Sequence, residues 1–199
     1  MAGLSQTHKK RRLFFPFFLA FILLSSTFAI VFSGYGENSS ASQASKEVIG
    51  TTTFFQRADG RWEGDVDGKP ILVSFSPHSL YTSTFEEGIS SLGSITKMYI
   101  VVSPGEQYSF AVEDLYITLK SSFGNVFLAC REDGEGCENL PLKTCADATA
   151  TTLVLSLELS AEEATPLIDG KCYRFVGTPT DIARQADSFL LHLFGVWEK

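Results

Sequence analysis

The 199-residue sequence predicts an α+β fold, a mixed or antiparallel sheet with helices packed on it, preceded by one transmembrane helix. Three observations lead to this prediction. A long uncharged apolar run lies near the N-terminus, several short apolar runs beyond it have the patterning of strands, and an amphipathic stripe with a clear start signal lies near the C-terminus.

The apolar run, residues 13–32, contains no charged residue and is the predicted signal-anchor. At a rise of about 1.5 Å per residue, a helix of this length covers the roughly 30 Å hydrocarbon core of a bilayer. The basic segment 1–12 precedes it, and no further Lys or Arg occurs until Lys46. The positive-inside rule therefore predicts a single-pass protein of the cell membrane, its N-terminus cytoplasmic and its C-terminal domain extracytoplasmic. The flanking charges are Lys9, Lys10, Arg11 and Arg12.

A cleaved secretory signal peptide is the alternative, which would make the chain a secreted protein. Thr27-Phe28-Ala29 would be a passable cleavage site, but the apolar core of such signals runs only about 7–15 residues. Here the apolar residues carry on from Ile30 to Phe32, so the length favours the anchor.

Residues 33–47, rich in Ser and Gly, are predicted to form a flexible stalk before an extracytoplasmic α+β domain at 48–199. Beyond residue 12 the chain has 12 basic and 23 acidic residues, a net charge of −11. Nucleic-acid binding depends on Lys and Arg that displace counterions from phosphates. The acidic balance therefore argues against a nucleic-acid partner.

Six strands are predicted inside the domain. Asp67-Gly68 is a dipeptide that suits a tight turn, so the runs on either side of it should form a β-hairpin. Leu153 to Leu159 alternates with period two, and three shorter apolar runs complete the set. Those three are Met98–Val102, Val126–Cys130 and Cys172–Val176.

Three helices are predicted. A capping box at Thr84 begins a short helix that ends before Gly93, and residues 107–122 fit helical spacing somewhat better than strand alternation. The last helix has Thr178 as its cap, Pro179 at the first helical position and an apolar stripe that ends before Gly195. The stripe comprises Ile182, Ala186, Phe189, Leu190 and Leu193.

The four cysteines lie within 43 residues, and an even number on the oxidising side of a membrane predicts two disulfides. None are spaced as zinc ligands or as a redox Cys-x-x-Cys pair. Of the three possible connectivities, Cys130 with Cys137 is preferred because Gly134 and Gly136 let the intervening loop fold back. Cys145 then pairs with Cys172.

Candidate chemistry is sparse. Glu63, Asp65 and Asp67 mimic the start of a calcium loop, but Ser74 stands where the closing Glu is needed. The only histidines of the predicted domain are His78 and His192, and the sequence has no serine-hydrolase, zinc-protease or phosphate-loop motif. We therefore expect no catalytic residue, no metal site and no cofactor.

These observations favour a single-pass membrane-anchored envelope protein whose outer domain binds a protein or a surface component. The membrane would be one partner, through residues 13–32, and another envelope protein a possible second. The alternative from a different class is an extracytoplasmic enzyme with no recognisable motif, whose carboxylates and a histidine would converge in a pocket.

Overall fold

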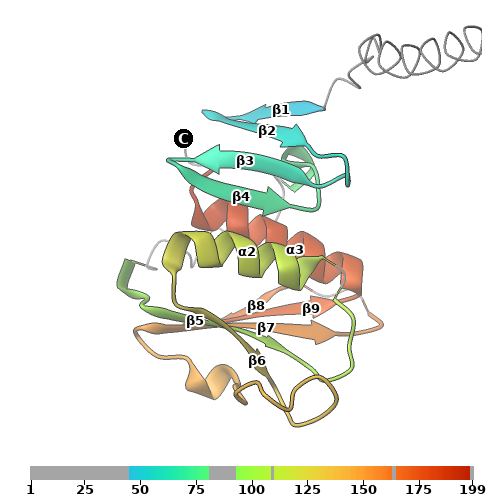
Figure 1. Cartoon of the computed structure of the whole chain (residues 1–199), viewed down its shortest axis with the longest axis vertical. Helices are drawn as coiled ribbons and strands as arrows, with labels where there is room; N and C mark the ends of the chain where they lie inside the picture. The colour runs from blue at the N-terminus through green and yellow to red at the C-terminus, as the bar shows by residue number, and fades with distance from the viewer. Residues whose placement is uncertain (1–44, 81–92, 109, 163–164, 198–199) are drawn as a thin grey trace, which may run out of the picture. The chain divides into compact units, whose positions relative to one another are not determined.

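A computed structural model of the chain describes residues 45–80, 93–108, 110–162 and 165–197, and these form two helices and two sheets (Figure 1). The α+β prediction is confirmed. The predicted transmembrane helix at 13–32 and the short helix expected after Thr84 both lie outside the described residues. Within the described ranges, neither helix has the length and apolar character needed to cross a bilayer.

The first sheet is an antiparallel meander of four strands in chain order: β1 (Lys46–Ile49), β2 (Thr52–Gln56), β3 (Trp62–Val66) and β4 (Lys69–Val73). The predicted hairpin is confirmed, because Val66 pairs with Lys69 across a two-residue turn. Asp67 and Gly68 have φ angles of 55° and 79°, as this tight turn requires. β1 and β2 were not predicted, and β1 begins in the last two residues of the expected stalk.

The second sheet is mixed, in the order β6-β5-β7-β9-β8. The first four of these strands are parallel neighbours, and β8 pairs with β9 antiparallel at the other edge. All four strands predicted for this part of the chain are confirmed, whereas β8 was missed. The strands are β5 (Lys97–Val102), β6 (Val126–Cys130), β7 (Thr152–Leu159), β8 (Leu167–Asp169) and β9 (Cys172–Gly177).

The two helices are α2 (Ala111–Phe123) and α3 (Pro179–Leu193), and both confirm predictions. α3 has the expected capping box. The Thr178 hydroxyl accepts a hydrogen bond from the Asp181 backbone N–H at 3.3 Å, and the Asp181 carboxylate accepts one from the Thr178 N–H at 3.0 Å. Gly195 follows the helix end with a positive φ of 63°.

Both helices pack between the first sheet and one face of the second, and a single apolar core runs through these layers (Figure 1). The helices contribute Leu115, Leu119, Phe189 and Leu190, all fully buried. The short 3-10 helix η1 (Pro77–Leu80) contributes Leu80. Leu155 and Leu157 of β7 belong to the same core, so these alternate residues of β7 face the helices.

The opposite face of the second sheet is crossed by the segment 131–151, which leads from β6 to β7 and contains the 3-10 helix η3 (Cys145–Asp147) (Figure 1). A smaller apolar cluster forms there from Val101, Ala129, Val154 and Cys172, with Cys145 packed against it. We call this the outer face of the sheet. It carries the Cys145–Cys172 disulfide and most of the polar features described next.

Candidate functional site

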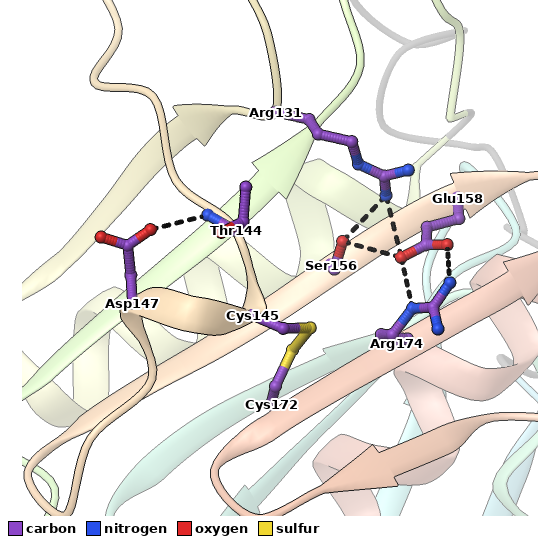
Figure 2. The surroundings of a disulfide bond; sticks show 8 residues. All are labelled: Arg131, Thr144, Cys145, Asp147, Ser156, Glu158, Cys172 and Arg174. Carbon is purple, nitrogen blue, oxygen red and sulfur yellow. Dashed lines mark hydrogen bonds and ion pairs between the residues drawn. A yellow bond between two sulfur atoms is a disulfide. The ribbon is translucent and has the colours of Figure 1, made fainter.

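The predicted disulfide pairs are the pairs that the structure forms. Cys130 at the end of β6 bonds to Cys137, and Cys145 of η3 bonds to Cys172 at the start of β9. The second bond fastens the segment 131–151 to the outer face of the sheet (Figure 2). The described part of the chain contains no free cysteine.

A charged network lies beside this disulfide and joins residues of β7 and β9 to the residue that follows β6 (Figure 2). Arg174 of β9 donates two hydrogen bonds to the Glu158 carboxylate of β7, one from Nε at 2.7 Å and one from Nη2 at 2.5 Å. Arg131, directly after β6, reaches the same carboxylate at 2.9 Å. Its Nη2 also donates to the Ser156 hydroxyl at 2.9 Å. The network therefore ties three strands together on the outer face.

The electrostatics of this network favour an ionised Glu158. Burial by itself would raise the pKa of Glu158, but the Arg174 hydrogen bond and the positive charges of Arg131 and Arg174 outweigh it and leave the pKa below its usual value. The hydrogen bonds that Arg174 donates to Glu158 raise the pKa of Arg174 in turn. Two guanidinium groups share one carboxylate, so the charged side chains of the network pair with one another.

A groove of about 600 Å³ runs along the edge of the second sheet, where β6 has no neighbouring strand. We call it the β6 groove. Its floor is Val126, Phe127 and Leu128 of β6. One wall comes from Tyr116 and Lys120 of α2, and the other from the segment 131–151. The remaining lining residues are Lys97, Tyr99, Asn139, Leu140 and Pro141.

An aromatic pair with lysines around it lies at this groove. The ring centroids of Tyr99 and Phe127 are 5.9 Å apart, and Phe127 is 42 % exposed. The Nζ atoms of Lys97 and Lys143 lie 5.9 Å and 5.4 Å from the Tyr99 centroid. Lys120 Nζ lies 5.5 Å from that of Phe127. Such distances allow cation–π attraction, which holds the amines near the rings while leaving them accessible to solvent.

The three lysines differ in their partners. Lys143 forms an ion pair with Asp147 at 2.8 Å, and this hydrogen bond raises the pKa of Lys143. Among the described residues, no carboxylate forms an ion pair with Lys97 or Lys120; Lys120 donates to the carbonyl oxygen of Gly124. The groove is therefore basic on a domain that is acidic as a whole.

A further hollow, of about 350 Å³, lies at the carboxyl end of β5 between residues 102–106 and 135–137. β5 and β7 are adjacent there, and the strands that follow them lie toward opposite edges of the sheet, an arrangement at which parallel sheets commonly bind ligands. The hydroxyl of the buried Tyr108 contacts two residues that line this hollow: it accepts from the Ser103 N–H at 2.9 Å and is hydrogen-bonded to Glu106. These two polar groups are therefore already engaged within the chain.

Two buried carboxylates, Asp114 of α2 and Asp187 of α3, serve the packing of the first sheet. Asp187 accepts hydrogen bonds from the backbone N–H groups of Ser74 and Phe75. Asp114 accepts from the Ser74 hydroxyl at 2.7 Å and from Arg61 at 2.9 Å. Burial raises the pKa of both carboxyls. Perturbed acids can mark active sites, but Asp187 is directed at backbone N–H groups, Asp114 is directed at Ser74 and Arg61, and neither lines the hollows described above.

The residues that the sequence offered as chemical candidates do not converge. Asp65 accepts a hydrogen bond from the Gly68 N–H at 2.8 Å, which makes the acidic hairpin tip a turn. His192 of α3 contacts the Ser188 carbonyl at 2.8 Å through Nδ1 and lies against Trp197. His78 lies in η1. The part of the chain that the structure describes holds no group of three or more His, Cys, Asp or Glu placed to bind a metal ion.

The β6 groove was missed because its residues come from four separate stretches of the chain. One signal was present. Tyr99 alternates with the buried Met98 and Ile100 in the strand predicted at Met98–Val102, so it had to point to the other face of the sheet, and Lys97 directly before that strand continues the alternation. Comparison with known proteins adds no family or function: no family model, curated protein or solved structure matches the chain.

Proposed function

We propose that the protein is a single-pass membrane protein whose outer domain binds another protein through the β6 groove, without chemistry of its own. Residues 13–32 would hold it in the membrane, with the described domain outside the cytoplasm. The observation that carries the binding role is the groove, which joins partly exposed aromatic rings, lysines and an open strand edge in one hollow.

The composition of the groove supports protein recognition. Interfaces between proteins are enriched in aromatic side chains, which contribute large contact areas at a small cost in conformational entropy. Phe127 and Tyr99 supply such area at the edge of the sheet, and the lysines around them supply charge at the rim. Rim charges steer the approach of a partner and help to select it.

The placement of the other polar groups also supports a role in binding. Asp114 and Asp187 are occupied in holding the first sheet, and the Arg131–Glu158–Arg174 network is occupied in holding three strands. The disulfides fasten the segment that forms one wall of the groove. A wall fixed in this way favours binding because it loses less conformational freedom when a partner binds.

The test is site-specific photo-crosslinking of the full-length chain in membranes of its source cells. A photoreactive residue replaces Phe127 in one variant and Phe55, a half-exposed aromatic of β2, in the control. We expect a reproducible cross-linked protein from position 127 and none in common with position 55. Recovery of the chain alone from position 127, or identical products from both positions, would contradict the proposal.

A further inference from the structure

We propose that the ligand of the β6 groove is an extended, acidic segment of a partner protein, which adds to the sheet as a strand beside β6. This inference rests on the proposed function and names the chemistry of the partner. Two observations carry it, the direction of the β6 backbone groups and the charge around them.

The hydrogen bonds of β6 show which of its peptide groups face the groove. Those of Asn125 and Arg131 point toward β5: the Met98 N–H donates to the Asn125 carbonyl at 3.0 Å, and the Arg131 N–H donates to the Val102 carbonyl at 2.9 Å. Backbone groups alternate in direction along a strand, so those of Val126, Leu128 and Cys130 point away from β5.

The chain itself already uses one end of this edge. The Cys130 N–H donates to the Pro141 carbonyl at 3.0 Å, the Lys143 N–H donates to the Cys130 carbonyl at 2.8 Å, and Leu142 bridges to Cys130 in parallel. The edge therefore accepts an added parallel segment. At Val126 and Leu128, which line the groove, no backbone partner of this kind is present among the described residues.

An added strand would direct alternate side chains to the two faces of the sheet. On the outer face they would contact the rings of Phe127 and Tyr99, and on the other they would meet Tyr116 and Lys120 of α2. Apolar or aromatic side chains suit the rings. Carboxylates suit Lys97 and Lys120, whose charges no described carboxylate pairs.

Charge complementarity favours an acidic peptide over the other polymers that lysines and aromatic rings attract. Of the six lysines among the described residues, three surround this groove, whereas the chain beyond residue 12 carries a net charge of −11. A nucleic acid or an anionic bilayer presents charge over a wide surface and would meet that acidic body. It would also leave the peptide groups of the β6 edge unused.

The test measures binding of synthetic peptides to the full-length protein in detergent by fluorescence anisotropy at low salt. The probe is a labelled peptide of alternating Glu and Val. The comparison peptides are alternating Lys and Val, and the acidic peptide with Pro-Pro in place of its two central residues, which removes a ladder N–H in either register. We expect the acidic peptide to bind at least about tenfold more tightly than either.

Two variants test whether the acidic peptide binds at the β6 groove. Lys97→Glu/Lys120→Glu should weaken binding of the acidic peptide by about tenfold, because two attractions become repulsions. Lys46→Glu/Lys69→Glu makes the same charge change on the first sheet and should leave the affinity within about twofold. Hydrogen exchange followed by mass spectrometry should show slower exchange at residues 126–128 when the acidic peptide is bound.

Several outcomes would overturn the inference. These are equal binding to both variants, equal binding of the Pro-containing peptide, unchanged exchange at 126–128, or a stronger signal with oligo-dT or with vesicles of anionic lipid. If any occurs while Phe127 still cross-links to a protein, the groove binds a partner of different chemistry and the proposed function stands. If both experiments fail, both proposals are wrong.

Discussion

Asp187 of α3 lies with its Oδ2 atom 2.8 Å from the backbone nitrogen of Ser74, although 113 residues separate the two in sequence. The same oxygen accepts from the Phe75 N–H at 2.9 Å. Because the chain leaves β4 at this point, the carboxylate satisfies two backbone donors that no strand partner reaches. The contact fixes the end of the first sheet to the C-terminal helix.

Replacement of Asp187 by Asn should change how stability depends on pH. Burial raises the pKa of Asp187 in the folded state, so between about pH 4 and that raised value the folded chain binds more protons than the unfolded chain. In that window the wild-type protein loses stability as the pH rises. Asn has no charge and can still accept both hydrogen bonds.

The measurement is urea denaturation of both chains from pH 4 to pH 7.5. The free energy of unfolding of Asp187→Asn, relative to wild type, should increase steadily with pH. Parallel pH profiles would show that burial of this charge carries no cost.

Local sequence signals predicted most elements of this fold. The hairpin at Asp67-Gly68 and the capping box of α3 depend on residues adjacent in sequence, so the pattern alone was sufficient. β1, β2 and β8 were missed. β8 has only three residues, and β2 presents Phe54 to the core and the half-exposed Phe55 to solvent, which obscures the alternation.

Non-local contacts were beyond sequence reasoning. The partners of Asp187 and the assembly of the β6 groove depend on how distant elements pack, and no spacing along the chain encodes them. The sequence left three disulfide connectivities open, and the loop with Gly134 and Gly136 was the one reason to prefer Cys130 with Cys137, the pair that the structure forms. The pairing of Cys145 with Cys172 then followed by elimination.

Replacement of Glu158 by Gln should lower stability, because Arg131 and Arg174 would lose their shared anion. We expect a loss of about 1–2 kcal/mol at pH 7, since the carboxylate is largely buried and its hydrogen bonds are charge-assisted. The pKa of Glu158 is lowered in the folded state. The contribution is therefore present above the unfolded value of about 4.3 and is lost as the pH falls through the folded pKa.

Glu63→Gln is the matched control, because Glu63 pairs with Arg57 at 3.3 Å while both side chains are about half exposed. It should change the free energy of unfolding by less than about 0.5 kcal/mol. Chemical denaturation at pH 7 and at a series of lower pH values compares the two variants. Equal losses at pH 7, or a loss for Glu158→Gln that does not shrink at any pH below about 4.3 at which the protein stays folded, would count against the network.

The proposed topology predicts the behaviour of reporter fusions. A reporter that is active only outside the cytoplasm should work when fused after Lys199, because the basic residues that precede the apolar run favour a cytoplasmic N-terminus. Replacement of the four basic residues at positions 9–12 by Glu should reduce the activity of that reporter. Activity of a cytoplasm-only reporter after Lys199 in the unaltered chain would contradict the topology.

Loss of the disulfide between Cys145 and Cys172 should destabilise the domain more than loss of the other one. The Cys145–Cys172 bond joins residues 27 positions apart, whereas the Cys130–Cys137 bond joins residues 7 positions apart. In the chain-entropy model, closing these loops restricts the unfolded chain by about 3.5 and about 2.4 kcal/mol. The longer bond also fastens η3 to β9, and with it one wall of the β6 groove.

The test compares the double variants Cys145→Ala/Cys172→Ala and Cys130→Ala/Cys137→Ala by thermal denaturation, with the larger fall in midpoint expected for the first. A single Cys145→Ser change should leave Cys172 reactive toward a thiol reagent after unfolding, and mass spectrometry of unreduced protein locates it. Four free thiols in protein recovered from its native compartment would contradict the bonding. They would also remove the argument for an oxidising location, because disulfides of this kind persist outside the cytoplasm and are reduced within it.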